Sequence, residues 1–472
     1  MQAGRFSEAL EFAERAVAGQ RACVPAHGML ATILLQLGRA DEAEEVVVRA
    51  LECAAGIPDA YDGLAHVSFL LRRHERSNAL YRRVVELAPE TPRFWYNLAT
   101  SERSFGRLAE AEAACDRAIA LDAAQYPSFL LRSELRVQTP DANHIEELRR
   151  QLARPGIDDR ARLFLGYALA KELDDLGRFD EAFHWFSDAA VTRRRHLAYD
   201  VAVDERKLKR IQEVFPAELA RNASRREGSS RYIFIVGLPR SGTTLLERIL
   251  TGLGAVRSNG ETENFSRALL AASPQDGRDV FLRAAAAAPD VVAENYAKLA
   301  DGTATDCKIV EKLPMNYLYL GAIRRALPEA RLLLVRRSPL DSCFAMYRTL
   351  FGEAYPFSYD FDDLARYYAA YDRLMSHWRT AFADDAHEVA YEELVKDPAG
   401  VGAAVARYCG VAWTPQAIDL KKNASVSLTA SAAQIRRPIY GSSSGRWRAY
   451  RAHLEPLIRA LRGGGIALPD DA

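Results

Sequence analysis

The chain is poor in the features that would place it outside the cell, on nucleic acid or in a membrane. Its 472 residues include only six cysteines, which form no Cys-x-x-Cys pair and have no partner histidines at zinc spacing. Lysine plus arginine number 63, as do aspartate plus glutamate, so the chain has no net charge to hold nucleic acid or an anionic membrane. No window approaches the ~18 apolar residues of a membrane span, and no basic segment followed by an apolar run stands at the start. We therefore expect a cytoplasmic protein of a bacterium-like cell, with reduced thiols and with neither a nucleic-acid partner nor a membrane.

The first third of the chain repeats with a period of 34 residues. Gly4, Gly38, Arg72 and Gly106 stand at the same position of successive copies, and small residues follow them at fixed distances. The residues five and twelve positions further on are Ala9, Ala43, Ser77 and Ala111, then Ala16, Ala50, Val84 and Ala118; the same relation returns at Gly177, Ala182 and Ala189. Small side chains at these spacings allow paired helices to approach closely, and this period is that of a helix–turn–helix repeat.

This pattern resembles the tetratricopeptide repeat (TPR) family over residues 1–195. The resemblance implies an all-α solenoid, either a plain scaffold or one whose concave surface binds a partner protein or an acceptor peptide. The chain starts at the glycine turn of a repeat, so we expect the first helix of that repeat to be missing from it. The sequence leaves the oligomeric state open.

From residue 231 onward, short apolar strands alternate with helices. The stretch RNASRREGSS, residues 221–230, has the composition of a linker, and we assign residues 196–230 to a connecting helix and this linker. The strand candidates are RYIFIVG, AVRSN, KIVEK, ARLLLVR and HEVAY. Their alternation with helices predicts a three-layer α/β domain with a central parallel sheet over residues 231–472.

The stretch GLPRSGTT, residues 237–244, links the first strand to a helix. Gly237 and Gly242 allow successive backbone amides to point inward, and the helix adds its positive N-terminal end, so the loop predicts an anion cradle. Nucleoside triphosphatases carry a lysine where this chain has Thr243, which weighs against a magnesium–triphosphate ligand.

The loop resembles the 5′-phosphosulfate loop of sulfotransferases that use 3'-phosphoadenosine 5'-phosphosulfate (PAPS), in the form seen in the tyrosylprotein and related branches. The resemblance implies a metal-free site in which Arg240 also faces the sulfuryl group. The residues that it assigns to the 5′-phosphate are Arg240, Ser241, Gly242, Thr243 and Thr244.

Two further segments resemble phosphate-binding motifs of the same family. In LLLVRRSPLDSCFAMY, residues 332–347, Arg337 matches the arginine that holds the 3′-phosphate. The serine expected eight residues later is Ala345, and Ser342 lies one helical turn earlier on nearly the same face. The late loop that closes over the cofactor in the family corresponds here to a stretch with three candidates, Ser443, Ser444 and Arg446. The alternatives are solvated charges at a strand end and a flexible linker.

An acidic and a basic residue follow two other strand candidates. Glu261, in SNGETENF, resembles the glutamate proposed as general base in tyrosylprotein sulfotransferases, and Glu263 is its local rival. A positioned carboxylate that takes the proton of the attacking hydroxyl contributes roughly 10²–10⁴-fold to the rate. Lys312, after KIVE, matches the family's lysine that touches the bridging oxygen, and it would offset charge in the transition state. Asn316 is a weaker candidate for positioning the substrate.

Together these motifs predict a TPR array joined to a PAPS-dependent sulfotransferase. Glu261 would act as base while Arg240 and Lys312 stabilise charge, and the product would be 3',5'-bisphosphoadenosine. The acceptor hydroxyl stays open between a protein tyrosine, a glycan and a small molecule. Two other classes of function stay open. One is a P-loop nucleotide kinase or phosphotransferase, and the lysine missing from the loop counts against it. The other is a TPR scaffold with an inactive α/β domain, which Ala345 supports.

Overall fold

The computed structural model describes residues 2–19, 24–54, 56–218, 230–301, 307–383, 385–420, 439 and 443–469. Its contacts divide the chain into two compact units. The helical unit is made of Met1–Gln138 with Glu146–Gln151, and the α/β unit is made of Thr139–Ile145 with Leu152–Ala472. The repeat copy that contains Gly177 therefore packs as part of the α/β unit, although the sequence pattern extends the repeat array to residue 195.

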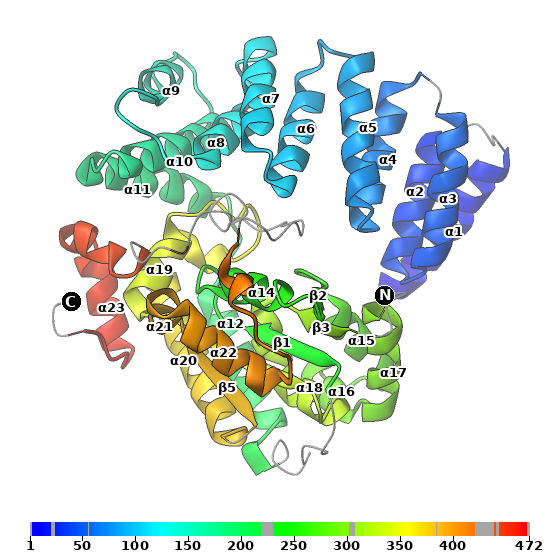
Figure 1. Cartoon of the computed structure of the whole chain (residues 1–472), viewed down its shortest axis with the longest axis vertical. Coiled ribbons are helices and arrows are strands. Elements are labelled where there is room, and N and C mark those ends of the chain that lie inside the picture. Colours follow the sequence, from blue (N-terminus) through cyan, green and yellow to red (C-terminus); the bar gives the residue numbers. More distant parts are fainter. Residues whose placement is uncertain are drawn as a thin grey trace. The chain divides into compact units, whose positions relative to one another are not determined.

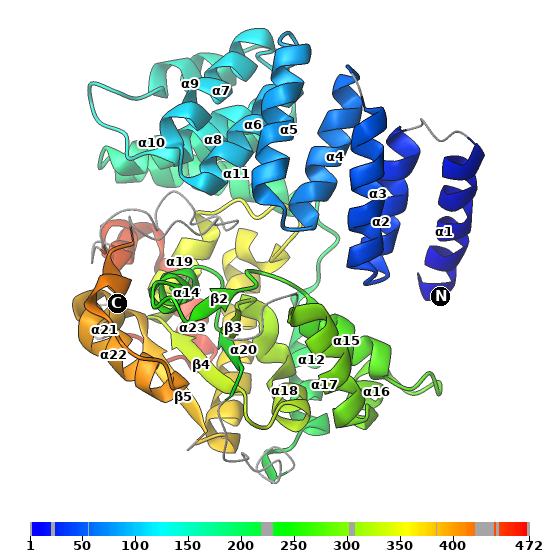
Figure 2. The same ribbon diagram turned by 45° about the vertical axis from the view of Figure 1, so that its right-hand side comes forward.

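The helical unit is built from paired helices, as Figures 1 and 2 show for their labelled ribbons. Its helices are α1 (Gln2–Gly19), α2 (Val24–Gln36), α3 (Ala40–Cys53), α4 (Pro58–Leu70), α5 (His74–Leu87), α6 (Pro92–Phe105), α7 (Leu108–Leu121), α8 (Tyr126–Leu135) and α9 (Ile145–Leu152). Consecutive helices pack against each other within each repeat, as α2 does with α3 and α4 with α5. The predicted tetratricopeptide architecture is confirmed for this part of the chain.

The repeated anchor residue adopts the left-handed backbone conformation in four of its five copies, whereas Gly4 lies inside α1. The φ angles are 80° at Gly38, 61° at Arg72, 76° at Gly106 and 73° at Gly177. Glycine reaches this conformation without steric strain, whereas an L-residue with a Cβ atom costs about 1–2 kcal/mol there. The turn between the two helices therefore explains the 34-residue recurrence of glycine, and Arg72 fills one turn at a conformational cost.

The small residues of the pattern lie between the paired helices. Ala43, Ala50, Ala111 and Ala118 have no exposed surface, and Ser77 is 1% exposed. The Ser77 hydroxyl donates to the Ala65 carbonyl oxygen at 2.8 Å, so the one polar member of this set is satisfied inside the array. Larger side chains at these positions would push the helices apart.

The α/β unit contains a five-stranded parallel sheet in the order β2-β3-β1-β4-β5. The strands are β1 (Tyr232–Val236), β2 (Val256–Ser258), β3 (Lys308–Glu311), β4 (Arg331–Arg336) and β5 (Ala386–Ala390). Each coincides with one of the strand candidates from the sequence. Figures 1 and 2 show these strands surrounded by helices, as a parallel sheet requires.

The helices of the α/β unit fall before, between and after the strands. They are α10 (Asp159–Asp175), α11 (Phe179–Arg195), α12 (Val201–Val214), α14 (Thr243–Thr251), α15 (Asn264–Ala272), α16 (Val280–Ala286), α17 (Pro289–Ala300), α18 (Leu320–Ala326), α19 (Pro339–Tyr347), α20 (Phe361–Ala381), α21 (Tyr391–Lys396), α22 (Pro398–Cys409) and α23 (Glu455–Gly463). Short 3₁₀ helices are η1 (Pro314–Tyr319), η2 (Pro356–Tyr359), η3 (Pro415–Ile418) and η6 (Arg446–His453).

Apolar side chains fill the centre of the sheet. Ile233, Ile235, Val310 and Leu333 have no exposed surface, and together with Leu246 of α14 they form one buried cluster. Continuous runs of β-branched and leucine side chains fit strands that are covered on both faces. This core fixes the carboxyl ends of β1, β2, β3 and β4, from which the predicted site residues project.

The helices α10, α11 and α12 pack directly on the α/β core. The Tyr167 hydroxyl donates to the Tyr347 carbonyl oxygen at 3.2 Å, and Arg194 pairs with Asp363 of α20 at 2.7 Å. Phe215, just after α12, covers Gly321, where a Cβ atom would lie 2.7 Å from the Phe215 ring carbon Cγ. These three helices therefore complete the hydrophobic core of the α/β unit.

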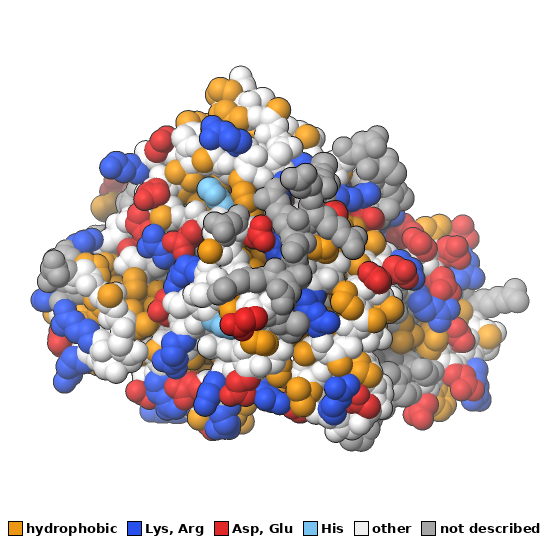
Figure 3. Space-filling view, turned by 90° about the horizontal axis from the view of Figure 1, so that it is seen from below, with side chains coloured by type: hydrophobic (Ala, Val, Ile, Leu, Met, Phe, Trp, Pro, Cys, Tyr) orange, Lys and Arg blue, Asp and Glu red, His pale blue; other side chains and the backbone are white. Residues whose placement is uncertain are grey.

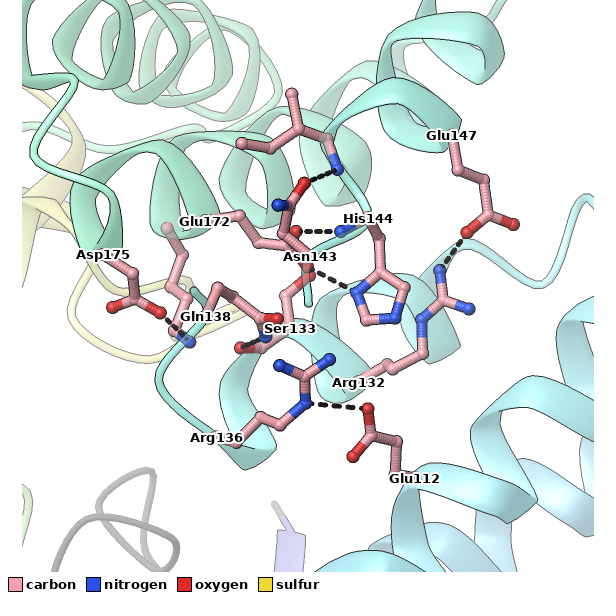
Figure 4. Close-up of polar contacts among 12 residues, drawn as sticks. Glu112, Arg132, Ser133, Arg136, Gln138, Asn143, His144, Glu147, Glu172 and Asp175 are labelled. Atoms are coloured by element: carbon pink, nitrogen blue, oxygen red, sulfur yellow. Dashed lines mark hydrogen bonds and ion pairs between the residues drawn. The ribbon is translucent and has the colours of Figure 1, made fainter. Parts of the chain in front are cut away.

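The segment before α10 is held by a buried carboxylate, shown in Figure 4. Glu172 of α10 has no exposed surface and accepts hydrogen bonds from the His144 amide at 2.6 Å and from its ring nitrogen Nδ1 at 2.9 Å. The Asn143 side chain accepts from the Ile145 amide at 3.2 Å. The irregular stretch around residues 139–143 is thus a defined connection fastened to α10.

The side chains that could bind a metal ion are dispersed over the part of the chain that the structure describes. Within the described ranges, no three His, Cys, Asp or Glu side chains gather as a metal site would require, and no helix is long and apolar enough to cross a membrane. The free cysteines in those ranges are Cys53, Cys115, Cys307, Cys343 and Cys409. Figure 3 shows positive and negative side chains interspersed on the face it presents.

Candidate active site

The loop that follows β1 is shaped by two glycines. A Cβ atom on Gly237 would lie 2.6 Å from the Val335 carbonyl oxygen, and one on Gly242 would lie 2.4 Å from the ring of Tyr391. Gly242 also has a φ of +103°, which L-residues rarely adopt. Arg240 has a φ of 65°, so the loop bends through the left-handed region twice before α14 begins at Thr243. Only glycine fits at positions 237 and 242.

The loop buries hydroxyl groups at the start of α14. Ser241, Thr243 and Thr244 are 2%, 3% and 8% exposed. The Ser241 hydroxyl oxygen makes no hydrogen bond to any described residue, although it is buried. A buried hydroxyl without a partner is unfavourable, and an anion at the helix N-terminus would satisfy it. The predicted phosphate-loop residues therefore lie together, as their sequence order requires.

Glu261 and Lys312 meet at the carboxyl ends of β2 and β3. Lys312 has no exposed surface, and its ammonium group forms an ion pair and hydrogen bond with Glu261 Oε1. Its nitrogen also lies 3.6 Å from Glu247 Oε2, on the helix that follows the phosphate loop. The Glu261 side chain keeps 35% of its surface exposed, against 10% for Glu247. The pair therefore joins an accessible carboxylate to a buried cation.

The same pair is tied to the phosphate loop through the backbone. The Lys312 amide donates to the Gly260 carbonyl oxygen at 3.2 Å, and the Gly237 amide donates to the Pro314 carbonyl oxygen at 3.2 Å. Ser258 donates to Glu247 and accepts from the Gly260 amide. Glu261, Lys312 and the loop are thus parts of one hydrogen-bonded arrangement.

A buried glutamate orders the segment that carries Glu261. Glu311 has no exposed surface and accepts hydrogen bonds from Thr262, Asn259, Asn264 and Tyr296. Burial, and after it the charge of Glu311, raises the pKa of Tyr296 well above its ordinary value, so this phenol stays a donor. Glu311 therefore positions the residues on either side of Glu261.

Glu263 occupies a different environment from its rival Glu261. It lines a cavity of about 580 Å³ with Phe215, Leu270, Val280 and Phe281, among other residues. This cavity is mostly apolar and lies among α12, α15, α16 and α18. The two glutamates thus differ in their surroundings, and Glu261 is the one paired with Lys312.

Arg337 is buried between the phosphate loop and the late loop. It donates to the Arg240 carbonyl oxygen at 2.7 Å and to the Ser443 carbonyl oxygen, and its guanidinium carbon lies 4.6 Å from the centre of the Tyr391 ring. Burial lowers the pKa of Arg337. Its neighbour in sequence, Arg336, instead pairs with Glu388 at an exposed strand end.

The small cavity beside Arg337 contains the proposed substitute for the missing serine. Ser241, Arg337 and Ser342 all line a space of about 30 Å³, room for about one water molecule. Ser342 is 1% exposed, and its hydroxyl donates to the Arg337 carbonyl oxygen at 3.4 Å. Ser342 thus lies next to Arg337, whereas Ala345 supplies no hydroxyl; their predicted 3′-phosphate role stays a prediction.

The late loop is fastened by two aspartates that the sequence analysis missed. Asp341 of α19 accepts from the Gly445 amide at 2.6 Å and from the Trp447 amide at 3.4 Å. Asp174 of α10 accepts from Arg446 at 2.8 Å, from Arg348 at 2.7 Å and from the Tyr450 hydroxyl. The Arg446 charge is therefore paired with a repeat helix, and its predicted contact to a cofactor stays a prediction.

Asp174 remains a carboxylate in spite of its burial. Burial alone would raise its pKa, but the nearby charges of Arg348 and Arg446 outweigh this effect and hold the pKa of Asp174 below its usual value. Arg446 also lies over the ring of Phe179, 4.9 Å from its centre. The start of α11 and the end of α10 thus hold the loop that contains Ser443 and Ser444.

Known proteins match the chain in two separate regions. A sulfotransferase family model matches residues 232–415, and two tetratricopeptide repeat models match residues 1–66 and 65–126. An uncharacterized protein of Aquifex aeolicus (strain VF5) is 28% identical over 385 residues, which cover 78% of this chain and 50% of that protein. The chain thus spans about half the length of that curated relative.

Solved structures show similarities in both regions, with TM-scores too low to add to the argument. The sulfotransferase domain of the Synechococcus PCC 7002 olefin synthase is 20% identical, with a TM-score of 0.37, over 52% of this chain and 99% of that one. The sulfotransferase STF9 of Mycobacterium avium is 14% identical, with a TM-score of 0.28, over 68% of this chain and 96% of that one. The sequence matches show that this chain joins N-terminal tetratricopeptide repeats to a C-terminal domain that matches the sulfotransferase family over residues 232–415.

Proposed function

We propose that the α/β unit transfers a sulfuryl group from PAPS to an acceptor hydroxyl without a metal ion. The observation that carries this proposal is the pairing of Glu261 with Lys312 beside the loop of residues 237–244. The site thus offers a carboxylate to take a proton and a cation to meet developing negative charge. The match of residues 232–415 to the sulfotransferase family supports the reaction class.

The residues of the loop fit the phosphate groups of such a donor. The buried Ser241 hydroxyl has no hydrogen-bond partner among the described residues, and Gly242 cannot be replaced without a clash. Both features suit a loop that wraps an anion closely. Arg337, buried next to Ser342, suits a second phosphate group. When bound, the donor supplies the sulfuryl group, and the protein supplies position, proton transfer and charge.

Three side chains then have distinct tasks. Glu261 accepts the proton of the acceptor hydroxyl as that oxygen attacks sulfur. Lys312, which has no exposed surface, offsets the charge left on the departing phosphate oxygen. Arg240, inside the loop, adds positive charge on the donor side. Because a buried ammonium group interacts strongly with nearby charge, Lys312 is expected to contribute more to the rate than to donor binding.

Donor recognition is tested by calorimetric titration with 3',5'-bisphosphoadenosine, 5′-AMP and magnesium-ATP. We expect the bisphosphate to bind most tightly, and we expect Arg240→Ala to weaken it at least tenfold. Tighter binding of magnesium-ATP than of the bisphosphate would contradict the proposal and favour a nucleotide kinase.

The role of the base is tested with Glu261→Gln and the matched control Glu263→Gln. The first variant should lose roughly 10²–10⁴-fold in kcat while its affinity for the bisphosphate changes little, because the carboxylate acts on the acceptor proton. The second removes the same charge two residues away and should keep its rate. A similar loss of rate in both variants would contradict the assignment of Glu261.

A further inference from the structure

A cavity of about 410 Å³ in the α/β unit has four aromatic side chains in its lining, beside the charged residues Asp200, Asp204 and Lys207. Tyr199, Tyr355, Phe357 and Tyr367 contribute rings, and Met315 contributes a thioether. The rings of Phe357 and Tyr367 are stacked with centroids 3.6 Å apart, and these residues are 2% and 1% exposed, so they form the deep part of the cavity. The volume falls within the range of pockets that hold small organic molecules.

The cavity lies close to Glu261 and Lys312. Met315 follows Lys312 by three residues, so the chain separates their Cα atoms by at most about 11 Å. Burial, and next to it the negative charge of Glu261, raises the pKa of Tyr355. A ligand in the cavity would therefore have Glu261 and Lys312 within reach of one of its ends.

The polar groups around the cavity already have partners in the protein. The Tyr199 hydroxyl donates to Asp204 at 2.9 Å, and the Lys207 ammonium group donates to the same carboxylate at 3.2 Å. The Tyr367 hydroxyl is hydrogen-bonded to that of Tyr317 at 2.6 Å. Burial raises the pKa of Tyr199 and of Tyr367, so both rings stay neutral. The cavity thus offers ring faces more than hydrogen-bonding groups, which suits an aromatic ligand better than a sugar.

We propose that this cavity binds the ring of a phenolic acceptor and presents its hydroxyl to Glu261. The proposal rests on the function proposed above and names its substrate class. The phenolic oxygen forms a bond to sulfur as the bond from sulfur to the donor's 5′-phosphate oxygen breaks. The electron pair of that bond stays on the phosphate, and the phenolic proton passes to Glu261 and then to water. Stacking between aromatic rings favours such binding.

One wall of the cavity lies upstream of the sulfotransferase family match. Tyr199, Val203 and Lys207 line it, whereas the match begins at residue 232. Acceptor choice is therefore built partly from α12 and from the connection that precedes it.

The test blocks the mouth of the cavity without touching the site. Val203 is 54% exposed and lines the aromatic cavity, and Val280 is 49% exposed and lines the separate cavity next to Glu263. We would compare wild type, Val203→Trp and Val280→Trp. Each protein is titrated with 3',5'-bisphosphoadenosine and then assayed for sulfuryl transfer from PAPS to 2-naphthol, to a tyrosine-containing peptide and to cyclohexanol.

We expect transfer to the phenols, a loss of at least tenfold in kcat/KM for 2-naphthol in Val203→Trp, and wild-type behaviour in Val280→Trp. Transfer to the peptide as well as to 2-naphthol would identify protein tyrosine as a source of the phenol. Transfer to cyclohexanol alone, or a loss in Val280→Trp but not in Val203→Trp, would overturn the inference. All three proteins should bind the bisphosphate equally; failure of wild type to bind it would instead overturn the proposed function.

Discussion

Replacing Asp174 with asparagine should loosen the late loop that contacts Arg337. The substitution keeps the shape of the side chain and removes the charge that faces Arg348 and Arg446. Breaking a buried ion pair costs about 3–5 kcal/mol. Because these arginine side chains keep 23% and 29% of their surface exposed, water compensates part of the loss, and we expect about 2 kcal/mol.

Hydrogen–deuterium exchange of peptides that cover residues 443–454 measures this loss locally. A cost of about 2 kcal/mol corresponds to exchange that is roughly 30-fold faster. We also expect weaker bisphosphate binding, because the Ser443 carbonyl oxygen accepts from Arg337 in the same loop. The matched control is Asp175→Asn, which removes the adjacent carboxylate and its 2.6 Å pair with Lys171. Equal exchange rates in the two variants would refute the reasoning.

The stability that Asp174 contributes should decrease as the pH is lowered. Its pKa is below the ordinary value near 4 in the folded protein, because Arg348 and Arg446 outweigh the effect of burial. Its stabilising contribution is therefore complete above about pH 4 and is lost as the pH falls through the folded-state value. The difference between wild type and Asp174→Asn should shrink in acid, and a difference that grows there would contradict the assigned charge state.

Two backbone predictions follow from positive φ angles. Arg72→Gly should stabilise the protein by about 0.5–1 kcal/mol in thermal or urea unfolding, since relief of strain exceeds the added chain entropy, whereas Arg72→Ala keeps the Cβ atom and should not stabilise it. Gly242→Ala should abolish bisphosphate binding in calorimetry, because its Cβ atom would lie 2.4 Å from the Tyr391 ring. Gly254→Ala, at φ +72° with nothing within 4 Å, should cost about 1 kcal/mol and keep binding. Normal binding by Gly242→Ala would show that the loop adapts.

Local sequence patterns were sufficient to predict the helices and strands and the order in which the motifs follow them. Short apolar, β-branched runs predicted β1 to β5, and the 34-residue recurrence predicted the helix pairs, because both patterns reflect contacts close in sequence or fixed by a turn. Glu261 and Lys312 were assigned by family resemblance, and they lie close together because β2 and β3 are parallel neighbours that end at the same edge of the sheet. Their direct ion pair could not be predicted from the sequence, because it depends on how the two side chains are placed.

The residues that support the site were missed for a physical reason. Asp174 contacts Arg446 across 272 positions, and in the sequence it looks like an ordinary polar residue of a repeat helix. Glu311 stands at the end of an apolar strand, and this charge in KIVEK was the one signal that pointed to it. Such partners are set by tertiary packing, which no local pattern records. The tyrosylprotein branch and the cytoplasmic location likewise stay predictions from the sequence.

The packing of α10, α11 and α12 on the α/β core constrains how this protein can exchange parts with others in evolution. A recombination breakpoint at residue 230, where the family match is about to begin, would separate Tyr167, Asp174 and Arg194 from the partners that they contact across the core. A breakpoint between residues 138 and 152 would follow the division between the two compact units instead. Repeat arrays of different length or specificity can therefore be exchanged in front of α10, but the last helix pair must be inherited together with the catalytic sheet.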